Sequence, residues 1–107
     1  MSLPKRIIRF VVIYDICVID DSYEERRSSA KRRAKVMRIL YDYGIRTQYS
    51  VFEVELRSNQ YSELISRISQ VIRETSDKVY IYPLDSRSIR KTVRLGRISE
   101  IVSDFFL

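Results

Sequence analysis

Residues 7–16, with the sequence IIRFVVIYDI, give the clearest indication of the fold. Its centre, residues 10–14, is an unbroken run of aromatic and β-branched side chains that is too short for a buried helix. Such a run is typical of an interior strand, so we predict a central strand that is covered on both faces. One carboxylate, Asp15, lies near its end between Tyr14 and Ile16.

Two helices are predicted downstream of this strand. Residues 22–25, SYEE, fit a capping box, and the helix that they open would run to Tyr43 and stop at Gly44 in the left-handed cap position. Helical spacing predicts its packing face as Ala30, Ala34, Met37, Leu40 and Tyr41. A second apolar stripe predicts another helix, capped by Ser58 or Asn59. The stripe consists of Tyr61, Leu64, Ile65, Ile68, Val71 and Ile72.

Three further segments are predicted to be extended. Residues 46–56 alternate, but their apolar phase flips at 51–52, which predicts two short strands or one sharply bent ribbon. Residues 79–84 predict another strand, and residues 92–95 predict a short edge strand. The tyrosines of the 79–84 strand are expected in the core rather than stacked on bases: Tyr80 and Tyr82.

This order of elements predicts an α+β fold, a ferredoxin-like βαββαβ sandwich with an antiparallel sheet and two helices on one face. The length of 107 residues fits one domain, 1–107. A bare second sheet face predicts a homodimer that packs sheet to sheet. The extra C-terminal segment, 98–107, is apolar at helical spacing and ends in Phe-Phe-Leu. We expect it to dock, on the partner protomer or on its own chain.

The composition excludes several function classes. Without histidine the chain has no imidazole base and no histidine zinc ligand. The single cysteine, Cys17, excludes an internal disulfide and fits a reducing cytoplasm. Two glycines cannot form a glycine-rich nucleotide loop. No apolar run approaches the roughly 18 residues of a membrane span and no signal peptide is visible, so we expect a cytoplasmic protein with no membrane partner.

The net charge of +6 is unevenly placed. Residues 15–25 hold five acids and no base, whereas residues 26–38 hold seven bases and residues 87–97 hold five, both without an acid. Dense basic blocks favour phosphate contact, although such faces are also commonly just solvated. The residues predicted to bind nucleic acid, either duplex DNA or RNA, are Arg27, Lys31, Lys35, Arg38, Arg90, Lys91 and Arg94.

Asp15 is the leading candidate for chemistry. A carboxylate in so apolar a strand is costly unless it is paired or binds metal, so the alternatives are a turn cap or an arginine partner. In a chain without histidine, phosphodiester hydrolysis would use Mg²⁺ or Mn²⁺, which needs only one or two carboxylates plus water and substrate phosphates. A dimer would bring two copies of Asp15. The acids that follow, from Asp20 to Glu25, fit a solvated loop and the acidic first turn of a helix.

Four pieces of the sequence together resemble one family, the small CRISPR-associated endonuclease of spacer acquisition, Cas-two (Cas2). They are YDI at 14–16, RAKV at 33–36 leading to YGIR at 43–46, QYSVFE at 48–53 and KVYIYPL at 78–84. The resemblance covers roughly residues 7–96, and its most distinctive piece is QYSVFE placed just after Tyr-Gly. The stretch 17–32 is longer than in compact members, so Asp15 alone is carried over as metal ligand and catalytic residue.

The resemblance implies a ferredoxin-like homodimer in which Asp15 faces its two-fold mate and holds a divalent metal, Mg²⁺ or Mn²⁺. Members are described as metal-dependent nucleases on RNA or double-stranded DNA, and also as non-catalytic scaffolds for the CRISPR integrase, Cas-one. Two hypotheses therefore stand: a metal-dependent endonuclease in antiviral defence, or a dimeric DNA-binding scaffold in the integrase complex. A third, more distant reading is a small RNA-binding or toxin-like ferredoxin-fold protein outside CRISPR systems.

Overall fold

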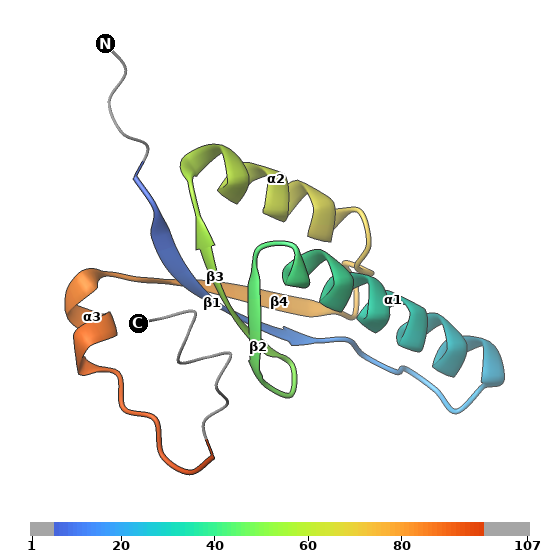
Figure 1. Ribbon diagram of the computed structural model, residues 1–107. Helices are drawn as coiled ribbons and strands as arrows, with labels where there is room; N and C mark the ends of the chain where they lie inside the picture. The colour runs from blue at the N-terminus through green and yellow to red at the C-terminus, as the bar shows by residue number, and fades with distance from the viewer. Residues whose placement is uncertain (1–5, 98–107) are drawn as a thin grey trace.

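The computed structural model describes residues 6–97. It contains a four-stranded sheet with two long helices on one face and a short helix after the last strand (Figure 1). The elements in chain order are β1 (Ile8–Asp15), α1 (Tyr23–Tyr41), β2 (Gly44–Gln48), β3 (Val51–Leu56), α2 (Ser58–Ser69), β4 (Lys78–Leu84) and α3 (Ser86–Lys91). The first six elements confirm the predicted βαββαβ order. The tail 98–107 and its predicted docking lie outside the described residues.

β1 is an interior strand, as predicted. The strand order is β2-β3-β1-β4 and every pairing is antiparallel, with Val12 opposite both Phe52 of β3 and Ile81 of β4. α1 and α2 lie on the same side of the sheet, as predicted for the sandwich (Figure 1), so cover of the second face remains a prediction that depends on a partner protomer. On the side away from these helices, here called the outer face, Ile13 is 42% exposed.

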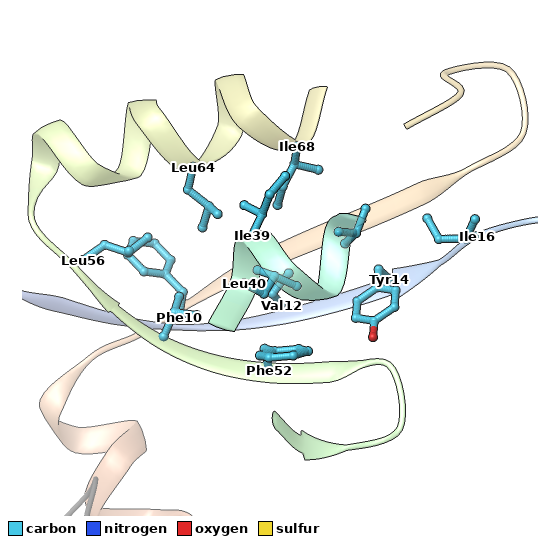
Figure 2. Close-up of a cluster of buried hydrophobic side chains, with 12 residues drawn as sticks. Phe10, Val12, Tyr14, Ile16, Ile39, Leu40, Phe52, Leu56, Leu64 and Ile68 are labelled. Atoms are coloured by element: carbon cyan, nitrogen blue, oxygen red, sulfur yellow. The ribbon is translucent and has the colours of Figure 1, made fainter. Parts of the chain in front are cut away.

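The core lies between the sheet and the two long helices. Alternate residues of β1 and β3 are buried toward the helices, and Leu40 of α1 and Leu64 of α2 reach down to meet them (Figure 2). The predicted core position of two tyrosines of β4 is wrong: Tyr80 and Tyr82 are about half exposed on the outer face. The period of two along β4 gives the helix side to Val79 and Ile81 instead.

The start of α1 follows the prediction in part, and its end does not. Ser22 caps the helix by accepting a hydrogen bond from the N–H of Glu25 at 3.1 Å. The reciprocal half of the predicted capping box is wrong, because the N–H of Ser22 donates to Asp20 at 2.8 Å while the Glu25 side chain binds Arg73. The helix ends at Tyr41, and Gly44 has no positive φ and opens β2 instead of capping α1. Gly44 is needed for space, because a Cβ there would lie 2.0 Å from the carbonyl oxygen of Glu53 on β3.

The predicted packing face of α1 is wrong for its first half and for Tyr41, which is 53% exposed. Ala30 and Ala34 are exposed, and the helix buries the following residues instead: Glu25, Ser29, Val36, Ile39 and Leu40. The buried stripe is displaced because the first turns of α1 pack against polar groups rather than against the apolar core.

The turn between β2 and β3, the start of α2 and the segment after α3 were each predicted from the sequence. A turn at Tyr49 and Ser50 separates β2 from β3, which confirms two short strands. α2 begins one residue earlier than predicted, with Arg57 as its cap. The edge strand predicted at 92–95 is wrong: this segment is irregular and follows α3, whose cap Asp85 accepts the N–H of Ser88 at 2.7 Å. No helix within residues 6–97 is long and apolar enough to cross a lipid bilayer.

Candidate metal and nucleic-acid site

Asp15 is the last residue of β1, and its side chain is exposed on the outer face. Its neighbours Tyr14 and Ile16 are buried on the helix side, so the pleat of the strand directs Asp15 away from the core. Within residues 6–97 no side chain forms an ion pair or hydrogen bond with the Asp15 carboxylate. Neither the turn cap nor the arginine partner considered for Asp15 therefore occurs in the described chain.

The other acids near the start of α1 do not gather around Asp15. Asp20 accepts the N–H of Ser22 at 2.8 Å, and hydrogen bonds from the Ser22 side chain and backbone lower the pKa of Asp20. Glu25 is buried against Arg73. Among the described residues no group of three or more carboxylate or thiol side chains could enclose a metal ion. Asp15 thus suits only an open coordination in which water or phosphate oxygens supply the remaining ligands.

A polar cluster that the sequence did not reveal lies beside the chain leaving β1. It consists of Glu25 and Arg32 of α1 with Arg73 and Asp77 of the turn between α2 and β4. Arg32 Nε donates to Asp77 Oδ2 at 2.8 Å, and Arg73 Nη1 and Nη2 donate to the two oxygens of Glu25 at 2.8 and 2.5 Å. No local motif marks these residues, because their partners stand 45 and 48 positions away in the sequence.

Hydrogen bonds keep both carboxyls of this cluster ionised. The Arg73 guanidinium, followed by the N–H of Ile19, lowers the pKa of Glu25 to about 2. Burial raises the pKa of Asp77, but hydrogen bonds from the backbone of Arg73, the side chain of Arg32 and the backbone of Cys17 outweigh it and leave that pKa below its usual value. The cluster is therefore two charged pairs, with no net charge at neutral pH.

Replacing Glu25 with glutamine should flatten the acid dependence of stability. A carboxyl whose pKa is depressed by folding contributes its full stabilisation above the unfolded pKa of about 4.5 and loses it as the pH falls toward about 2. The wild type should therefore lose stability more steeply than Glu25→Gln across this window. Urea unfolding at a series of pH values measures both slopes, and equal slopes would contradict the assignment.

The predicted basic face of α1 is present and exposed. Arg27, Lys31, Lys35 and Arg38 all lie at the surface. A groove of about 750 Å³ runs beside this face, and Tyr23, Lys31 and Gln70 are among its lining residues. The groove joins α1 to the end of α2, so a phosphate chain lying there would meet several cations from one helix.

The second basic block is divided by the fold. Arg90 and Lys91 are exposed at the end of α3, which lies at the opposite end of the sheet from the start of α1 (Figure 1). Arg94 instead makes a bidentate ion pair with Glu53, with its Nη2 and Nη1 at 2.6 and 2.9 Å from the two carboxylate oxygens. Arg94 therefore has an intramolecular role, holding the 92–97 segment against β3.

Comparison with known proteins places the chain in a family. Residues 8–92 match the family described as CRISPR associated protein Cas2. A protein named CRISPR-associated endoribonuclease Cas2 3 from Chloroflexus aurantiacus is 35% identical, over 80% of this chain and 81% of its own. A second, CRISPR-associated endoribonuclease Cas2 2 from Methanospirillum hungatei, is 37% identical over 86% of this chain and 90% of its own.

A solved structure agrees with this assignment. The crystal structure of Streptococcus pyogenes Cas2 superposes with a TM-score of 0.68 at 28% identity, covering 82% of this chain and 99% of that one. The similarity thus extends over both the sheet and the two long helices, and the sequence resemblance is confirmed. The chain belongs to the Cas2 family of CRISPR-associated proteins.

Proposed function

We propose that this chain is a metal-dependent endonuclease of CRISPR spacer acquisition that hydrolyses phosphodiester bonds of RNA or double-stranded DNA. The observation that carries the proposal is Asp15, an exposed carboxylate without a side-chain partner in residues 6–97, at the end of an interior strand. Relatives named endoribonucleases support RNA as the first substrate to test. Asp15 is the proposed catalytic residue because its carboxylate would bind the divalent ion that contacts the substrate phosphate.

The proposed cofactor is Mg²⁺ or Mn²⁺, with Asp15 as its ligand. These ions prefer carboxylate and water oxygens and need few protein ligands when substrate phosphates complete the coordination. Such an ion, when bound, supplies Lewis acidity toward a phosphoryl oxygen and a lowered pKa for coordinated water. Asp15 would hold the ion at the strand end, and the exposed Lys78, which lies opposite Asp15 in the pairing of β1 with β4, would offset negative charge on a phosphate bound there.

We further propose a homodimer that packs through the outer face. Ile13 is 42% exposed there, Tyr82 50% and Tyr80 53%, an apolar surface unusual for a protein that acts alone. A two-fold axis through this face would place two Asp15 carboxylates on the same side of the assembly. Light scattering on the full chain should give twice the 12.8 kDa chain mass, and a monomer at micromolar concentration would contradict the dimer.

A second candidate function is a scaffold that binds DNA beside the integrase Cas-one without cleaving it. The absence of any group of three or more possible metal ligands among residues 6–97 favours this alternative, because hydrolytic metal sites often gather more carboxylates. The basic surfaces serve either function equally, since both require phosphate contact. The two candidates differ only in whether the Asp15 carboxylate is needed for turnover.

A metal titration tests the endonuclease proposal. Purified full-length protein is incubated with single-stranded RNA and with duplex DNA, in Mg²⁺, in Mn²⁺ and in excess chelator. Cleavage should rise with added metal and disappear with the chelator, because the chain has no histidine to act as an alternative base. Absence of cleavage in every metal, with intact duplex binding, would favour the scaffold.

Nucleic-acid binding should depend on the basic face of α1. Lys31→Glu with Lys35→Glu should weaken duplex binding and lower the slope of log affinity against log salt by about 0.9 for each phosphate that the protein no longer neutralises. A comparison variant, Arg90→Glu with Lys91→Glu, makes the same change in net charge on α3, so the two variants together show which predicted basic block contacts nucleic acid. Unchanged affinity and slope for the Lys31 and Lys35 variant would remove α1 from the interface and leave the 87–97 block as the candidate.

A further inference from the structure

The polar cluster of Glu25, Arg32, Arg73 and Asp77 holds the backbone that leaves β1. We call residues 16–22, between β1 and α1, the connector. Asp77, whose side chain is fully buried, accepts the N–H of Cys17 at Oδ1, 3.0 Å away. Its other oxygen, Oδ2, accepts Arg32 Nε at 2.8 Å and the N–H of Arg73 at 2.7 Å. One buried carboxylate thus joins the connector, α1 and the turn before β4.

Arginine side chains of α1 also bind the backbone carbonyls of the connector. Arg32 Nη2 donates to the carbonyl oxygen of Cys17 at 3.2 Å. Arg33, from the next position on α1, donates to the carbonyl oxygen of Ile16 at 3.4 Å. Farther along, Glu25 Oε2 accepts the N–H of Ile19 at 2.8 Å while it binds Arg73. Side chains therefore form hydrogen bonds with the backbone of three of the four residues that follow Asp15.

We propose that this cluster is a positioning device for Asp15, an inference that rests on the proposed metal-ligand role of that residue. β1 fixes the chain only up to Asp15, which is the last residue of the strand. A side chain at a strand end keeps one orientation only when the backbone beyond it is also held. Glu25, Arg32, Arg73 and Asp77 supply that restraint, and so they set where the Asp15 carboxylate lies on the outer face.

A comparison within the chain separates this role from general stabilisation. Asp42 and Arg67 also join α1 to α2, with Arg67 Nη2 2.8 Å from Asp42 Oδ2, but at the far end of α1. That pair makes no contact with the connector and both of its side chains are exposed by more than a third. It therefore offers a control: an arginine–aspartate ion pair that also ties α1 to a neighbouring element, without access to Asp15.

The test compares Asp77→Asn with Asp42→Asn in the full-length protein. Two properties are measured: amide hydrogen exchange at residues 16–19 without metal, and Mn²⁺ affinity by calorimetry. Asp77→Asn turns an amide donor toward Arg32 or Cys17, so exchange there should accelerate at least about tenfold. Its Mn²⁺ affinity should fall by about tenfold or more, as is typical when the support behind a metal ligand is removed. Asp42→Asn should match the wild type in both measurements.

Each outcome decides a different claim. Unchanged exchange in Asp77→Asn would overturn the fastening, and faster exchange with unchanged Mn²⁺ affinity would overturn the positioning role. If the wild type binds no Mn²⁺, or Asp15→Asn binds it equally well, the metal-ligand proposal for Asp15 fails and the positioning claim fails with it. Should Asp77→Asn not fold, Arg73→Lys provides the same test, because lysine keeps the charge but cannot make the two-pronged interaction with Glu25.

Discussion

Asp15→Asn should abolish metal-dependent cleavage and leave the fold and nucleic-acid binding intact. Asparagine keeps the shape of the side chain but removes the charge that holds a divalent cation, so the rate should fall by at least about 100-fold. The Asp15 carboxylate is exposed and pairs with no side chain of residues 6–97, so its removal leaves no buried charge unpaired. Stability should therefore change by no more than about 0.5 kcal/mol.

The matched control for this experiment is Asp21→Asn. Asp21 is also exposed and carries the same charge, but it lies on the connector rather than at the strand end. It should retain wild-type cleavage. Cleavage by Asp15→Asn that also survives chelation would indicate another site or a contaminating nuclease. A wild type that cleaves nothing, together with an Asp15→Asn variant that binds DNA and supports integration with Cas-one, would establish the scaffold in place of the endonuclease.

The elements that the sequence predicts well are those whose causes are local. The run at 10–14 is apolar at every position, and only an interior strand accommodates so short a run. Ser22 lies three residues before Glu25, which is the spacing that an N-terminal cap requires, and the Ser22 side chain accepts the N–H of Glu25 as that spacing predicts. Neither inference needs any knowledge of what the distant parts of the chain supply.

The elements that the sequence predicts poorly depend on distant partners. The first turns of α1 expose Ala30 and bury Glu25, because Arg73 supplies a charge that makes burial of this carboxylate favourable. Arg94 belongs to a basic block, and nothing in that local pattern indicates that Glu53 of β3 binds it. In both cases a charge pattern indicated solvent or ligand, whereas the fold brings an opposite charge from more than 40 positions away.

In the candidate site, too, one part is predictable from local sequence and the other depends on distant partners. Asp15 could be singled out from sequence because a carboxylate in an apolar strand is costly wherever the rest of the chain lies. The cluster behind it could not, because an arginine in a basic block and an aspartate before a strand are both ordinary at the surface. Only the fold shows that Asp77 is buried and that it accepts the N–H of Cys17.

Gly44→Ala should be among the most destabilising single substitutions in the described chain. A Cβ at this position would lie 2.0 Å from the carbonyl oxygen of Glu53 and 2.7 Å from the Cα of Val54. Both atoms belong to the backbone of β3, so no side-chain rotation can relieve the overlap and β2 must move away from its partner strand. We expect a loss of about 3 kcal/mol or more and a fall in Tm of roughly 10 °C or more.

Gly96→Ala provides the matched control, because the same methyl group is added where the surroundings differ. Gly96 has a φ of 86°, and a Cβ there would meet nothing within 4 Å. Gly96→Ala should therefore lower the free energy of unfolding by only roughly 1 kcal/mol, which is the cost of placing alanine in the left-handed region. Urea unfolding of both variants separates the two effects. If Gly44→Ala loses no more stability than Gly96→Ala, then β2 does not need this close approach to β3 and the steric explanation for Gly44 is wrong.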